Sequence, residues 1–129
     1  MTSTHASDDA SDLAAAMMDA ARNGDRAALA PFLDAGAPLD MQDADGNTML
    51  MLAAYHGHAE LVRDLAARGA SVDLVNDRGQ SPLAGAVFKG DAEVVSVLVA
   101  AGADADAGTP TARESAQFFG RSELADLLP

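Results

Sequence analysis

The chain has 129 residues, a length that suits one domain with a buried core and needs no disulfide or metal. It has no cysteine, which excludes disulfides, thiolate catalysis and cysteine-based zinc sites. Twenty Asp and Glu residues against eight Lys and Arg residues give a formal net charge of -12, which disfavours nucleic acid and anionic lipid and favours a basic protein partner. The same acidity is equally consistent with a role in solubility alone.

The N-terminal segment, MTSTHASDDASD, has neither the basic nor the apolar region of an export signal. No stretch approaches the roughly 18 apolar residues of a membrane span. We therefore predict a cytoplasmic protein without a membrane anchor. Residues 1–9 are expected to form a disordered tail before a domain that covers residues 10–129.

A period of 33 residues runs through this domain. In successive units it repeats two glycines, an alanine and an aspartate: Gly24, Gly57 and Gly90; Gly36, Gly69 and Gly102; Ala37, Ala70 and Ala103; and Asp40, Asp73 and Asp106. Four residue classes do not share one period by chance, so the domain is a repeat array. Its predicted units are residues 10–42, 43–75, 76–106 and 107–129.

The first unit begins with a polar sequence and is expected to cap the N-terminal end of the array. Pro31 lies inside its predicted second helix. Because a proline there removes a hydrogen bond and clashes with the preceding turn, we expect a kink or an early break at this position.

The second and third units each contain two predicted helices. Thr48 is expected to cap the first helix of one unit, and Ser81 followed by Pro82 that of the other. Left-handed glycines are expected to end the first helix of every unit: Gly24, Gly57, Gly90 and Gly120. The second helices are expected to open at a polar cap: Asp25, His58, Asp91 and Ser122. Turns that form projecting fingers are expected at Asp45-Gly46 and Asp77-Arg78-Gly79.

The fourth unit is expected to begin its first helix at Thr111. The interval from Thr111 to Gly120 repeats the nine-residue interval from Thr48 to Gly57. The unit stops where a second helix would be completed, so we expect it to be a C-terminal cap.

The second unit, DGNTMLMLAAYHGHAELVRDLAARGASVD, resembles an ankyrin repeat at nearly every marker position, and the third matches it in register. The resemblance covers roughly residues 10 to 129. It implies an all-α solenoid of stacked helix-turn-helix pairs with projecting β-turn fingers. The family's usual T-P-L-H reads TMLM from Thr48 and SPLA from Ser81, so the histidine is absent and we expect some stability to be lost between these units.

The sequence carries no nucleophile elbow, phosphate-binding glycine loop or kinase signature, and we predict neither an enzyme nor a cofactor. His56 and His58 flank a glycine and offer an alternative, a metal-binding or small-molecule-binding domain. Without a cysteine or an evident third ligand this alternative is the weaker one.

An aromatic residue recurs near the end of the first helix, as Tyr55, Phe88 and Phe118. The resemblance places this position on a concave groove, beside three further candidates: His56, Lys89 and Phe119. It also points to fingertip residues as binding positions: Asp45, Asn47, Asp77, Arg78 and Gln80. The rings could equally well shield helix packing, and both interpretations stay open here.

The resemblance implies a protein–protein interaction module. We expect a monomeric adaptor or regulator that binds a protein partner through its concave face and fingers. The abundance of alanine suggests a bacterial source.

Overall fold

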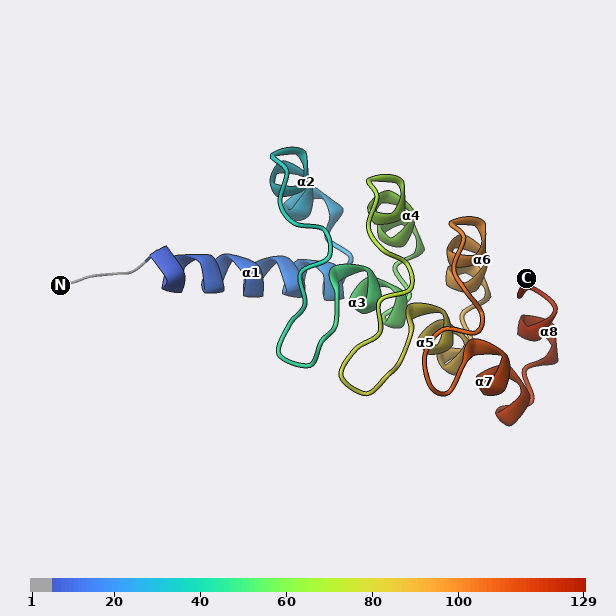
Figure 1. Cartoon of the computed structure of the whole chain (residues 1–129). Helices are drawn as coiled ribbons and strands as arrows, with labels where there is room; N and C mark the ends of the chain where they lie inside the picture. The colour runs from blue at the N-terminus through green and yellow to red at the C-terminus, as the bar shows by residue number, and fades with distance from the viewer. Residues whose placement is uncertain (1–5) are drawn as a thin grey trace.

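The computed structural model describes the backbone of residues 6–129 and the side chains of residues 11–129. The described residues contain eight α-helices in four consecutive pairs (Figure 1): α1 (Ala6–Asn23) and α2 (Arg26–Asp34), α3 (Met49–Tyr55) and α4 (Ala59–Ala67), α5 (Pro82–Lys89) and α6 (Ala92–Ala100), and α7 (Ala112–Phe118) and α8 (Ser122–Ala125). Each predicted unit holds one pair, except that α1 begins four residues before the first unit.

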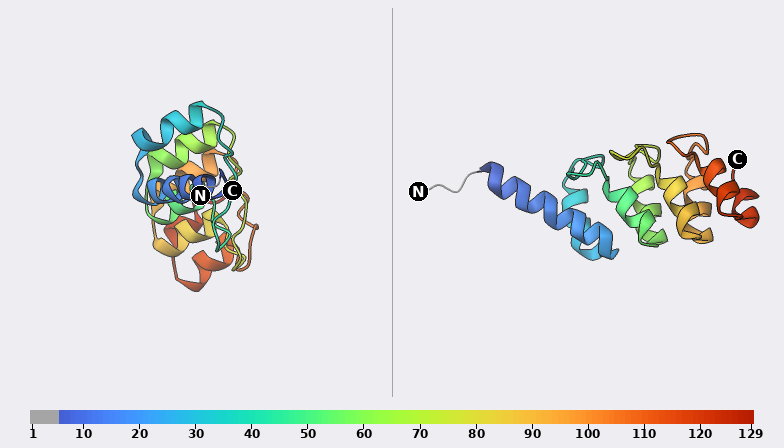
Figure 2. Two further views of the ribbon diagram at one scale, coloured as in Figure 1. Left: turned by 90° about the vertical axis from the view of Figure 1, so that its left-hand side faces the viewer. Right: turned by 90° about the horizontal axis from the view of Figure 1, so that it is seen from below.

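The four pairs stack side by side into an elongated array. The first helices α1, α3, α5 and α7 pack against one another in order, and the second helices form a parallel row beside them (Figure 1). Segments that join one pair to the next project to one side as successive fingers (Figure 2). A continuous apolar core follows the array and includes fully buried leucines: Leu50, Leu61, Leu65, Leu83 and Leu98. Stability in such an array is close to a sum of contacts between neighbouring units.

Hydroxyl caps open the first helices, as predicted. Thr48 Oγ1 accepts a hydrogen bond from Met51 N, and Ser81 Oγ accepts one from Ala84 N, each at 3.1 Å. Thr111 forms a full capping box with Glu114, which confirms the predicted start of the first helix in the fourth unit. Met51 and Ala84 occupy the position of the absent histidine and are both buried. The expected loss of stability there stays a prediction.

The N-terminal helix starts earlier than predicted. Residues 6–9 are helical, where a disordered tail was expected, and the remainder of that tail, residues 1–5, lies outside the described residues. The segment from Ala6 to Asn23 is rich in alanine and has neither glycine nor proline, so nothing in it interrupts a helix. As a result α1 is 18 residues long, whereas α3 has seven, and α1 extends beyond the stack (Figure 1).

Pro31 does not shorten α2, so the expected early break is wrong. The helix runs through Pro31 to Asp34 and has nine residues, as α4 and α6 do. Pro31 and Ala27 are both exposed, so water can hydrate the Ala27 carbonyl that the missing proline N–H leaves free. The Pro31 carbonyl still accepts a hydrogen bond from Ala35 N at 3.1 Å.

Candidate functional site

A buried asparagine holds the fingers of the second and third units together. Asn76 Oδ1 accepts hydrogen bonds from the backbone N–H groups of Arg78 and Gln80, each at 3.0 Å. Its Nδ2 donates to Asn47 Oδ1 and to Gln80 Oε1, each at 2.9 Å. Two of the predicted fingertip residues, Asn47 and Gln80, are therefore fixed by Asn76. Sequence reasoning missed Asn76, although it stands 33 residues after Asp43, at the same place in the repeat.

The finger backbones also contact one another. Asp77 N donates to Asp45 O, and Thr109 N donates to Gly79 O, each at 2.9 Å. Gly46 has a φ of +81°, and a Cβ there would lie 2.7 Å from Asp77 N, so the approach of the two fingers requires glycine. The side chains of Asp45, Asp77 and Arg78 remain exposed at the tips.

Beneath the fingers lies a line of side chains that we call the inner row. It consists of the two residues before the glycine that ends each first helix: Arg22 and Asn23, Tyr55 and His56, Phe88 and Lys89, and Phe118 and Phe119. Contacts between units join its members. Lys89 Nζ lies 4.7 Å from the centre of the Tyr55 ring, and the Phe88 and Phe119 rings meet edge to face with their centres 5.2 Å apart.

The inner row differs in exposure along its length. Tyr55 is half-buried, and its ring lies close to Gly85 of the next unit. Phe88 and Phe119 are 46% and 43% exposed, and Phe118 is 82% exposed. Helix packing therefore accounts for part of the Tyr55 ring but not for Phe118, whose ring contacts Phe119 with their centres 5.0 Å apart.

Two hollows separate the fingers from the inner helices. One has a volume of about 260 Å³ and brings together six of the predicted site residues: Asp45, Asn47, Tyr55, His56, Arg78 and Gln80. Sequence reasoning missed Arg22 and Asn76, which line it too. The other has a volume of about 430 Å³, and Phe118 and Phe119 line it together with Thr109, Pro110, Glu114 and Ser115. Asp77, Phe88 and Lys89 line neither hollow.

His56 and His58 have different surroundings. His56 lies at the end of α3 and is exposed over much of its surface. Its pKa is lowered from the usual value by the partial burial of its ring and by the charges of Arg22, His58 and Lys89. His58 Nε2 donates to Arg22 O at 2.8 Å, so this nitrogen is already engaged. Among the described side chains, no three His, Cys, Asp or Glu residues are grouped to hold a metal ion. The geometry gives the metal-binding alternative no support.

The residue that precedes the second helix of a unit contacts the unit before it. The His58 ring sits where a Cβ on Gly24 would be, 2.5 Å from Nδ1. Arg121 occupies the equivalent position of the fourth unit and donates from Nη2 to Phe88 O at 3.1 Å, over Gly90. Arg121, and not the predicted Ser122, is thus the residue that precedes the last helix. The prediction chose Ser122 because serine is a common N-cap residue. The contact of Arg121 with Phe88 O in the preceding unit instead places Arg121 at the N-cap.

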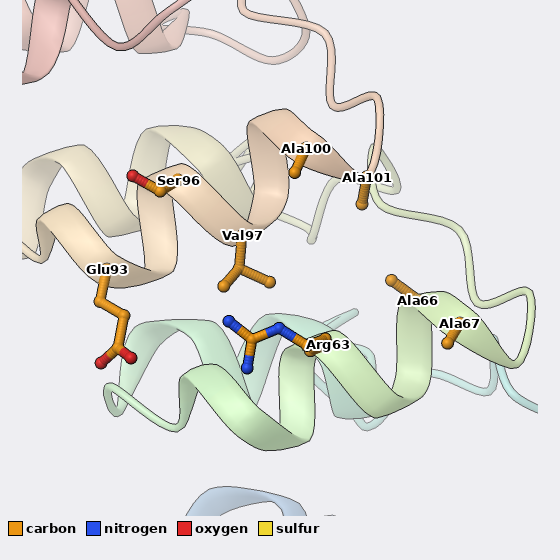
Figure 3. A pocket seen from close by; sticks show the side chains of 8 residues that line it. All are labelled: Arg63, Ala66, Ala67, Glu93, Ser96, Val97, Ala100 and Ala101. Carbon is orange, nitrogen blue, oxygen red and sulfur yellow. The ribbon is translucent and has the colours of Figure 1, made fainter.

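The outer face of the array has a hollow of its own, between α4 and α6, with a volume of about 400 Å³. Small side chains line most of it, with Arg63 and Glu93 at its edge (Figure 3). In Figure 3 Arg63 extends from α4 beneath Val97. Arg63 also forms an ion pair with Glu60 on its own helix. This hollow has no aromatic lining residue and provides control positions for the inner face.

Comparison with known proteins identifies the fold. A family model of ankyrin repeats, in three copies, matches residues 17–109, which is more than half of the chain. The chain is an ankyrin-repeat protein. It is also similar to a Pseudomonas aeruginosa protein named ankyrin repeat protein PA3287, with 43% identity over 47 residues. That match covers 36% of this chain and only 28% of the relative.

Family membership confirms the predicted all-α repeat solenoid. Ankyrin repeats are generally protein–protein interaction modules and are typically not enzymes. No helix in the described part of the chain combines the length and apolar character needed to cross a bilayer.

Proposed function

We propose that this ankyrin-repeat protein is an adaptor or regulator that binds a protein partner between its fingers and its inner row. It acts as a monomer in the cytoplasm, without a cofactor and without chemistry of its own. The net charge of -12 works against binding to nucleic acid or anionic lipid and attracts basic surfaces at long range.

The observation that carries this proposal is the exposure of three contacting phenylalanines. Phe88, Phe118 and Phe119 form one cluster beside a hollow of about 430 Å³, and Phe118 is 82% exposed. Aromatic side chains are the usual anchors of protein interfaces, where they fill desolvated pockets. The polar hollow beside Tyr55 supplies hydrogen-bonding groups further along the same inner row, as interfaces require.

Affinity capture with matched variants tests the proposal. The full chain, its Phe118→Ser variant and its Ser96→Ala variant are each immobilised and exposed to extract of the native cell, and captured proteins are identified by mass spectrometry. We expect one protein that wild type and Ser96→Ala retain and that Phe118→Ser loses, because Ser96 lies on the outer face. Retention by all three chains would show that the inner row is not the binding surface.

A further inference from the structure

The inner row changes character from one end to the other. Its first half carries cationic and polar groups, with Arg22 in the first unit and His56 in the second. Its second half is aromatic, ending in Phe118 and Phe119. Lys89 bridges the two halves, because it belongs to the third unit but lies over the Tyr55 ring of the second. None of the chain's twenty acidic residues occurs in the row.

Within the described residues, the inner row presents one positive charge, that of Lys89, without an ion pair. Lys89 forms no ion pair with any side chain that the structure describes, whereas Arg22 is paired with Asp19. Burial is the largest cause of the lowered pKa of His56, and the charges of Arg22, His58 and Lys89 lower it further, which indicates a positive local potential around that ring. The chain as a whole is acidic, so this positive potential is a local property of the groove, the space between the fingers and the inner row.

The finger wall opposite carries Asp43, Asp45 and Arg78. Asp43 Oδ1 accepts the backbone N–H groups of Asp45 and Asn47, each at 2.9 Å, so this carboxylate is largely committed to the turn. Arg78 offsets the exposed charge of Asp45. The finger wall keeps one net negative charge, but the charges that shift the pKa of His56 are those of Arg22, His58 and Lys89. The inner row and the adjacent His58 therefore set the sign of the potential beside His56.

We infer that the groove takes a segment of the partner protein that sets a carboxylate side chain against Lys89 and His56 and an apolar side chain over Phe118. This inference rests on the proposed function and names the chemistry of its partner. Two helix-to-helix steps of about 10 Å separate the two contacts, and an extended chain rises about 3.3 Å per residue, so about six residues separate the two side chains. The carboxylate satisfies the charge of Lys89, and the apolar side chain covers the Phe118 ring.

Three labelled peptides test this inference with the full chain, by fluorescence anisotropy. All share a Gly/Ser background of about nine residues. One carries a glutamate and a leucine about six residues apart, one replaces the glutamate by lysine, and one replaces the leucine by serine. We expect the glutamate–leucine peptide to bind at least roughly tenfold more tightly than either of the others.

Charge reversal in the protein supplies the matched control. Lys89→Glu should abolish the preference for the glutamate peptide, since it places like charges together. Arg63→Glu makes the same change of charge on the outer face and should leave the preference intact. Preference for the lysine peptide, equal binding of all three peptides, or no binding of any of them would overturn the inference.

The pH dependence gives a second readout, which depends on His56. The charged groups around it are Arg22 of α1, His58 before α4, Lys89 of α5, and the finger residues Asp43, Asp45 and Arg78. A bound carboxylate favours the imidazolium form of His56, so binding takes up a proton and affinity should rise as the pH falls from about 8 to about 6. His56→Gln should flatten this dependence. If the affinity of the wild-type protein decreased as the pH was lowered from about 8 to about 6, that result would contradict a carboxylate at this position.

The peptide experiment separates the two proposals. If the lysine peptide binds best and Phe118→Ser still removes its binding, the inner row is a protein-binding surface but takes a basic segment, and only the inference fails. If Phe118→Ser and Lys89→Glu change nothing for any bound peptide, binding lies elsewhere and the proposed function fails as well.

Discussion

At the scale of single residues, side-chain hydrogen bonds hold the fingers in place, in the role that a regular backbone ladder has in a β-sheet. Asn76 is buried, and its side chain makes four hydrogen bonds to three other residues. Without it, two backbone N–H groups lose their partner, and the side chains of Asn47 and Gln80 lose the group that fixes them. The geometry of the polar hollow beside Tyr55 therefore follows from this residue.

Asn76→Ala should lower the free energy of unfolding by about 1 to 3 kcal/mol, the usual penalty for leaving buried polar groups unsatisfied. Urea denaturation followed by circular dichroism measures the change. Asp45→Ala, at an exposed fingertip in the same hollow, should change stability by less than about 0.5 kcal/mol. Equal effects of the two substitutions would show that Asn76 does not organise the fingers.

At the scale of helices, the boundaries that local chemistry determines could be read from the sequence. The cap at Thr111 was predictable because a hydroxyl residue and the interval to Gly120 define it locally. The role of Arg121 was not, since its partner Phe88 O lies 33 residues away in another unit. Arg22 was missed for a similar reason: only stacking brings it to the hollow that His56 lines.

Helix α2 contains a proline without being broken, because the carbonyl that loses its hydrogen bond is exposed to water. Replacing Pro31 by alanine restores a helical N–H and removes the ring, so Pro31→Ala should raise the free energy of unfolding by about 1 to 2 kcal/mol. Pro38→Ala, in the exposed loop after α2, should give no gain, because there proline only restricts the unfolded chain. Thermal and urea denaturation of both variants compare them. A Pro31→Ala variant that is less stable than wild type would mean that the proline suits the helix after all.

At the scale of the whole molecule, the main contacts among the described helices join neighbouring units, so the ends of the array need protection. The fourth unit covers α5 with α7, and Arg121 fastens it to the third unit through Phe88 O. Its second helix, α8, has only four residues. A short unit of this kind suits a cap, because it covers the apolar flank of the third unit and leaves only a small apolar flank of its own exposed to solvent.

Deletion of residues 107–129 should expose the face of α5 that α7 now covers and should lower the melting temperature or cause aggregation. Differential scanning calorimetry and size-exclusion chromatography follow the two effects. A truncated chain that stays monomeric and melts at the wild-type temperature would show that the cap lies elsewhere.

The central claim is that the inner row binds the partner, and calorimetric titration of the captured partner tests it most directly. Phe88→Ala and Phe118→Ala should each weaken binding by at least roughly thirtyfold, because aromatic anchors are worth about 2 kcal/mol or more. The melting temperature of Phe118→Ala should stay close to that of wild type, since this side chain is 82% exposed. Arg63→Ala and Ser96→Ala on the outer face should leave affinity unchanged. Wild-type affinity in both aromatic variants, together with melting several degrees lower, would contradict the claim and assign the rings to packing.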